Sequence, residues 1–140
     1  MLHYKKGWCC FMKLDINNER EKLTTKYKKL WEFRKASIEE LYQEGKIDSE
    51  QKEALLQTQM AIVRTADLKT QNEYNSKSGD FFAKRAIKKN EAEINRMERF
   101  YNDNTKIIGQ SKIEKMEQEI LNRTGKKIEK YNEQNKGRKQ

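Results

Sequence analysis

Proline is absent from the 140-residue sequence, and only six glycines occur in it. Proline costs a helix interior roughly 3 kcal/mol and glycine about 1 kcal/mol relative to alanine, so few positions oblige a helix to end. The alternation of apolar and polar residues that marks strands is missing as well. We therefore expect an all-α protein built as elongated helical hairpins or as a four-helix bundle, with dimerisation as one way to complete the bundle.

Apolar residues are also scarce. They make up 34% of the sequence, against 38% for charged residues, whereas globular domains usually contain roughly 45–50% apolar residues. The core should therefore be thin and the domain elongated. No run approaches the roughly 20 apolar residues of a membrane span, and the apolar run at 8–12 is shorter than the core of a signal peptide. We expect a cytoplasmic protein that is not exported by the general route.

Cysteine and histidine are nearly lacking: Cys9 and Cys10 are adjacent, and His3 is the one histidine. Neighbouring cysteines cannot form a useful disulfide staple, and these three side chains fall short of the ligand pattern of a zinc site. The sequence also has no Walker A, GxSxG, GxGxxG or HExxH motif. We predict no catalytic residue, no metal and no cofactor, and thus a protein that is not an enzyme.

Two helices are expected in the first half of the chain. Capping residues at 17–18 precede a stretch in which apolar and aromatic residues recur at three- and four-residue steps, typical of one amphipathic helix. Gly45 ends that pattern, and Asp48 with Gln51 forms a capping box for the next helix, which should run towards Tyr74. The sequence therefore predicts a helical hairpin with a very short turn.

Residues 38–56, IEELYQEGKIDSEQKEALL, resemble the short C-terminal helical hairpin called SHOCT. The resemblance rests mainly on Gly45, Ile47 and Asp48. It implies an appendage used for oligomerisation or targeting. The same three residues also suit any tight turn between two helices, so a plain helical hairpin is the alternative.

The second half begins after a small polar segment at 75–80, NSKSGD, which predicts the principal loop. A third helix should start by Phe81. Its apolar residues recur at seven-residue steps and resemble a coiled-coil seam, but Asn90 and Asn104 interrupt the partner positions and favour bundle packing. The seam residues are Ile87, Ile94, Tyr101 and Ile108, with Met97 on the same side.

The ends of the chain look different from the helical domain, which we place at 15–131. Residues 1–14 should be a disordered leader, or should precede a true translation start at Met12. Near the other end, Gly109 predicts a break, and Ser111 with Glu114 suggests a capping box for a fourth helix. After residue 131 no apolar residue follows. We therefore expect a basic, flexible tail at 132–140.

Basic residues exceed acidic ones by nine, which favours anionic partners such as nucleic acid, acidic proteins or an anionic membrane surface. One basic cluster lies at the start of the third helix, beside Phe81 and Phe82, which could stack on exposed bases or belong to the core. An AT-rich genome would also give a lysine-rich composition without selection for binding. The candidate nucleic-acid contacts are Lys84, Arg85, Lys88, Lys89, Lys126, Lys127, Lys136, Arg138 and Lys139.

The first helix is unusually aromatic, and aromatic side chains are enriched where binding energy concentrates in protein interfaces. The candidate partner surface is Tyr27, Trp31, Phe33 and Tyr42. Phe33 lies off the apolar stripe, so its exposure would indicate a partner surface. Our main hypothesis is a small non-enzymatic binding protein, a regulator, inhibitor or adaptor of phage or plasmid origin, acting through protein contacts. The alternative is a basic protein that contacts nucleic-acid phosphates independently of sequence.

Overall fold

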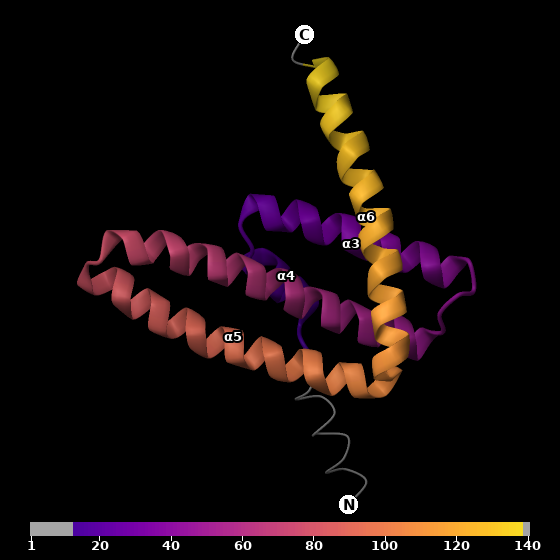
Figure 1. Ribbon diagram of the computed structural model, residues 1–140, viewed down its shortest axis with the longest axis horizontal. Coiled ribbons are helices and arrows are strands. Elements are labelled where there is room, and N and C mark those ends of the chain that lie inside the picture. The colour runs from indigo at the N-terminus through magenta and orange to yellow at the C-terminus, as the bar shows by residue number, and fades with distance from the viewer. Residues whose placement is uncertain (1–12, 139–140) are drawn as a thin grey trace, which may run out of the picture.

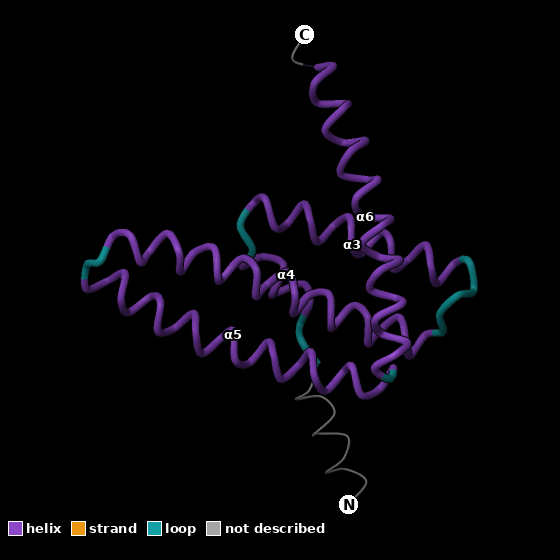
Figure 2. Tube along the Cα trace, viewed as in Figure 1, coloured by secondary structure: helices purple, strands orange, loops and turns teal. Residues whose placement is uncertain are grey.

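The computed structural model describes residues 13–138, with side chains from 13 to 136, and this part of the chain is all-α (Figure 1). Short loops connect its helices (Figure 2). His3, Cys9, Cys10, Met12 and Lys139 lie outside the described residues. The expectation of an all-α fold with helical hairpins is confirmed. The helices are α2 (Ile16–Lys22), α3 (Thr25–Gln43), α4 (Ser49–Ser78), α5 (Phe81–Ile108) and α6 (Gln110–Arg138).

Helix α4 is the centre of the domain, because α2, α3 and α5 all pack against it. One apolar cluster joins Trp31 of α3, Met60 of α4 and Met97 of α5, each of them fully buried. A second cluster joins Leu55 of α4 to Ile120 of α6, among others. Burying one such side chain contributes roughly 1.5–3 kcal/mol. These two clusters form the apolar core of the described chain.

The turn between α4 and α5 is shorter than the predicted loop at 75–80. Helix α4 continues through Ser78, and Gly79 then adopts a left-handed conformation with φ of 68°. Asp80 caps α5 by accepting a hydrogen bond from the Ala83 backbone nitrogen at 2.7 Å. Nothing in residues 75–78 opposes a helix strongly, so α4 ends only where glycine can take a positive φ.

The first amphipathic helix is broken in two, contrary to the prediction of a single helix. Helix α2 ends before Leu23, and Thr24 then donates from its backbone nitrogen to Asp67 Oδ2 at 3.0 Å and from Oγ1 to Oδ1 at 3.2 Å. The cap of α2 is Asp15, not a residue at 17–18. Leu14 was assigned to the leader, but it is buried and donates from its backbone nitrogen to Gln57 of α4 at 2.8 Å.

A buried ionic network fixes α2 against α4 and α5. Glu19 of α2 is 3% exposed. Its Oε1 lies 2.9 Å from Arg96 Nη2, and its Oε2 lies 3.6 Å from Arg64 Nε. Arg64 also donates to the Lys22 carbonyl at 3.1 Å and lies 3.9 Å from Asp67 Oδ2. Ion pairs therefore join α2 to α4 and α5, and the buried Leu14 and Leu23, which flank the helix, anchor it in the apolar core.

Helix α6 crosses α3 and then projects away from the other helices (Figure 1). It starts at Gln110, directly after Gly109, so the predicted capping box at Ser111 does not begin it. It also continues to Arg138, so residues 132–138, which we expected to form part of a tail after the last helix, are helical. These seven residues contain no apolar side chain, but four of them, Glu133, Gln134, Lys136 and Arg138, are good helix formers, and no proline stops the helix.

Candidate nucleic-acid interface

The tip of the α4–α5 hairpin exposes two adjacent phenylalanines. Phe81 is 70% exposed and Phe82 is 79% exposed, whereas the next residue, Ala83, is buried. Successive residues of a helix are separated by about 100° around its axis. The rotation of α5 that buries Ala83 and Ile94 therefore leaves the two rings exposed to solvent. The alternative in which Phe81 and Phe82 belong to the core is therefore wrong.

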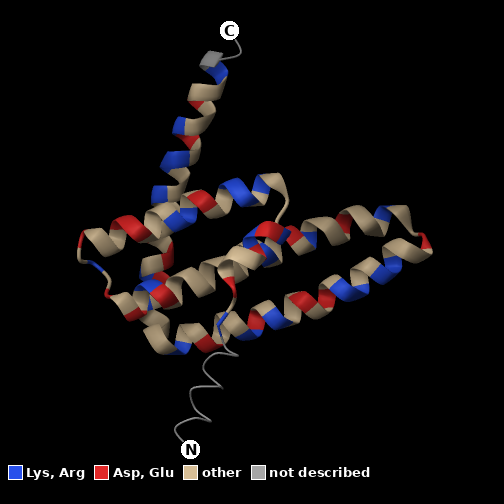
Figure 3. Cartoon of the chain, turned by 180° about the vertical axis from the view of Figure 1, so that it is seen from behind, with Lys and Arg blue, Asp and Glu red and all other residues tan. Residues whose placement is uncertain are grey.

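The predicted basic cluster follows these two rings along α5. Lys84, Arg85, Lys88 and Lys89 are all exposed, and none of them forms an ion pair with any other residue between 13 and 136. Residues 77–89 contain five basic residues and one acidic residue. Figure 3 shows the basic segments of α5 following its uncharged first turn. The tip therefore carries four neighbouring cations whose charges no carboxylate within ion-pair distance offsets.

A shallow hollow brings one ring and three of the four cations together. Phe82, Arg85, Ala86, Lys88 and Lys89 line a depression of about 580 Å³ on the outer side of α5. Ala86 makes room between the longer side chains. An apolar ring beside cationic groups can bind an anion that also carries a flat or apolar part.

Asp80 is the one acidic residue of the tip segment, and it is already engaged. It accepts hydrogen bonds from the Ala83 backbone nitrogen and from Ser78 Oγ, both at 2.7 Å. The Ala83 bond, followed by the Ser78 bond, lowers the pKa of the Asp80 carboxyl. Because Asp80 occupies the N-terminus of α5, an anionic ligand must be held here by side chains.

The predicted basic residues of α6 do not join this cluster. Lys127 Nζ is paired with Glu40 Oε1 at 2.8 Å, so it serves the contact between α6 and α3. Lys126 and Lys136 are exposed, and Arg138 ends the helix. The hairpin tip and α6 lie at opposite ends of the α4–α5 pair (Figure 1). The candidate contacts therefore fall into two separate regions.

The four aromatic residues predicted as a partner surface are engaged within the molecule. Trp31 is fully buried. The Phe33 ring packs edge-to-face on the Tyr131 ring of α6 with 5.8 Å between centroids, and it is half-buried. Tyr27 Oη lies 2.8 Å from Thr70 Oγ1, and the Tyr42 ring lies 4.5 Å from the ammonium of Lys52. These contacts form no exposed aromatic patch on α3.

The sequence did not identify Tyr74 as an exposed aromatic residue. Its side chain is 78% exposed on the last turns of α4, which the structure extends past the predicted end of that helix. Tyr74 lies beyond the dense apolar patch of α4 in the sequence, and this position could have indicated that its side chain is exposed. Tyr74 adds a third exposed aromatic residue to the end of the hairpin that carries Phe81 and Phe82.

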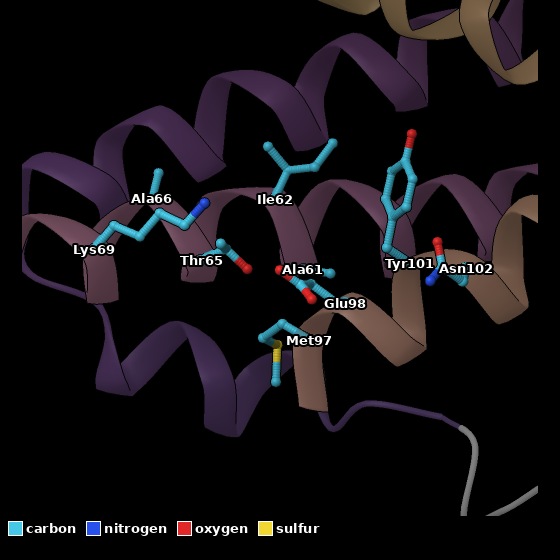
Figure 4. Close-up of a pocket in the computed structure, with 9 residues that line it drawn as sticks. All are labelled: Ala61, Ile62, Thr65, Ala66, Lys69, Met97, Glu98, Tyr101 and Asn102. Atoms are coloured by element: carbon cyan, nitrogen blue, oxygen red, sulfur yellow. The ribbon is translucent and has the colours of Figure 1, made fainter. Parts of the chain in front are cut away.

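A groove of about 510 Å³ between α4 and α5 was also missed (Figure 4). Small residues of α4, such as Ala61 and Thr65, face Met97 and Tyr101 of α5. Tyr101 donates from its hydroxyl to Glu117 Oε1 of α6 at 2.8 Å, and burial, followed by this bond, raises its pKa. This bond ties α5 to α6. The spacing of small residues by four along α4 was the signal for the groove.

Between residues 13 and 138, no three His, Cys, Asp or Glu side chains gather in a way that could hold a metal ion. None of the helices in this range combines the length and apolar character needed to cross a membrane. A comparison of the chain with protein-family models, curated protein sequences and solved structures finds no significant match. The resemblance of residues 38–56 to SHOCT thus gains no support from the family models.

Proposed function

We propose that this protein is a small non-enzymatic binding protein of the cytoplasm that holds nucleic acid at the tip of the α4–α5 hairpin. One observation carries the proposal: four exposed cations without ion-pair partners adjoin two exposed phenylalanines. Lys84, Arg85, Lys88 and Lys89 would neutralise backbone phosphates and release their counterions. This favours the nucleic-acid alternative over partner binding through α3, whose aromatic residues pack internally.

The contacts proposed here are independent of base sequence. Lysines dominate the cluster, and no helix carries a set of Arg, Asn and Gln side chains suited to base edges in the major groove. Each neutralised phosphate contributes about −0.7 to the slope of log affinity against log salt for a single strand, and about −0.9 for a duplex. Four contacts therefore predict a slope of roughly −3 to −4.

The test is fluorescence anisotropy of the full chain with labelled single- and double-stranded DNA and RNA over a salt series. The variant Lys88→Glu/Lys89→Glu should lose at least about tenfold in affinity and flatten the salt slope. Its matched control is Lys112→Glu/Lys115→Glu, which makes the same charge change at exposed positions of α6. Equal losses in the two variants, or an absence of salt-dependent binding, would overturn the proposal.

A protein partner remains the second candidate, because the aromatic residues at the hairpin end are exposed. Tyr74, Phe81 and Phe82 would then be the anchors of a regulator, inhibitor or adaptor. Binding of this kind would depend weakly on salt and would survive the Lys88→Glu/Lys89→Glu change better than the loss of the three rings. Titration of a candidate partner against both variants separates the two functions.

A further inference from the structure

We infer that the nucleic acid held at the hairpin tip is single-stranded, with unpaired bases stacked on Phe81 and Phe82. The inference rests on the proposed function and names its substrate class. The two rings are 70% and 79% exposed, in a chain where apolar residues make up only 34%. Two large apolar side chains kept in water beside a basic cluster indicate a ligand that supplies both flat apolar surface and negative charge.

The ring faces are available for stacking. The two rings meet edge-to-face, with centroids 5.8 Å apart and an interplanar angle of 77°, so each ring retains a face that the other does not cover. Lysine or arginine groups lie over the rings of Tyr27, Phe33 and Tyr42. Among the described residues, no such group lies over Phe81 or Phe82.

Basic side chains continue along α5 from each ring. Arg85 and Lys89 follow Phe82 at three and seven residues, and Lys84 and Lys88 follow Phe81 at the same steps. These steps place the cations about 5 Å and about 10 Å along the helix axis from the ring on nearly the same face. A strand that lays its bases on the rings would therefore run its phosphates past the cations.

Stacking selects single strands because a duplex keeps its bases paired and stacked on one another. A duplex would have to extrude a base, which costs free energy, before a phenylalanine could reach a base face. An unpaired strand offers those faces directly. Stacking of one base on an aromatic side chain is worth about 5- to 150-fold in affinity. Phosphate contact, by contrast, is available from both forms.

The experiment compares a labelled single strand, its duplex, and a strand of equal length made of abasic sites, all binding to the full chain. The abasic strand keeps the phosphates and removes the bases. We expect Phe81→Ala/Phe82→Ala to weaken single-strand binding at least about fivefold while changing duplex and abasic-strand binding less than about twofold. Phe82→Trp should retain the preference for the single strand. Leu121→Ala, at an exposed position of α6, is the control.

The outcomes separate the two proposals. If all three ligands bind with equal affinity, or if Phe81→Ala/Phe82→Ala weakens all of them equally, the stacking inference is overturned while phosphate binding stands. If none binds, both fail. Binding of vesicles of anionic phospholipid in place of the oligonucleotides, abolished by the same phenylalanine changes, would also overturn both and assign the tip to a membrane surface. Because Phe81 and Phe82 are exposed, we expect the variants to fold. An unchanged far-UV circular dichroism spectrum checks this.

Discussion

Replacing Glu19 by alanine should lower the free energy of unfolding, because this carboxylate is buried and ion-paired. Glu19 is 3% exposed and is the common partner of three cations from three helices. Lys22 lies on α2 itself, Arg64 comes from α4 and Arg96 comes from α5. Removal of the carboxylate leaves the buried guanidinium of Arg64 with fewer opposite charges, and it removes the ion pairs that join α2 to α4 and α5.

The magnitude follows from the surroundings of each cation. Breaking a buried ion pair typically costs about 3–5 kcal/mol. Arg64 is 9% exposed but keeps Asp67 at 3.9 Å and a backbone carbonyl, which reduces the penalty. Arg96 is 35% exposed and keeps Glu93 at 3.1 Å, so its share is about 1 kcal/mol or less. We expect Glu19→Ala to lower the free energy of unfolding by about 2–4 kcal/mol.

Urea denaturation followed by far-UV circular dichroism gives the free energy of unfolding and its dependence on denaturant. Glu93→Ala is the matched control, because it removes a carboxylate that contacts Arg96 from a half-buried position. The control should cost about 1 kcal/mol or less. If Glu19→Ala costs no more than the control, the network does not hold α2, and the reasoning from burial is refuted.

Four further outcomes are expected from the same assay. Arg123 holds the pKa of Glu44 at about 2, below its ordinary 4.5, so the pair stabilises the fold fully above about 4.5 and loses that effect as the pH falls towards 2. Glu44→Gln should flatten the dependence of the free energy of unfolding on pH in this acid range. An unchanged pH dependence would show that the pair does not contribute. Gly125→Ala should raise the free energy of unfolding by about 0.5–1 kcal/mol, because the site is helical with room for a methyl group. Gly79→Ala should lower the free energy of unfolding by about 1 kcal/mol, because a φ of 68° strains a residue that has a side chain. Trp31→Ala should cost about 3–5 kcal/mol, and an effect below 1 kcal/mol would contradict its place in the core.

Local physics predicted much of the helical framework. The Asp48 and Gln51 capping box forms as expected, with both of its hydrogen bonds present. Of the five seam residues predicted in the third helix, Ile94, Met97 and Ile108 are buried, and Ile87 and Tyr101 are half-buried. These features depend on residues close in sequence, whose geometry the helix itself supplies.

The features that could not be predicted from the sequence depend on contacts between residues far apart in the chain. The break at Thr24 depends on Asp67, and the burial of Glu19 depends on arginines of α4 and α5. The basic cluster itself was predictable from composition. Whether Phe81 pointed inward or outward depended on the rotation of α5 against α4, which only the packing of the two helices sets.

The exposed hairpin tip separates recognition from folding. The rings and cations at 81–89 that we assign to binding all lie outside the apolar clusters that contain Met60 and Leu55. Substitutions at such exposed positions usually change stability by no more than about 0.5 kcal/mol. The tip can therefore accumulate changes in ligand preference, by selection or by design, without compensating mutations elsewhere, and a library restricted to its exposed positions should consist largely of folded proteins.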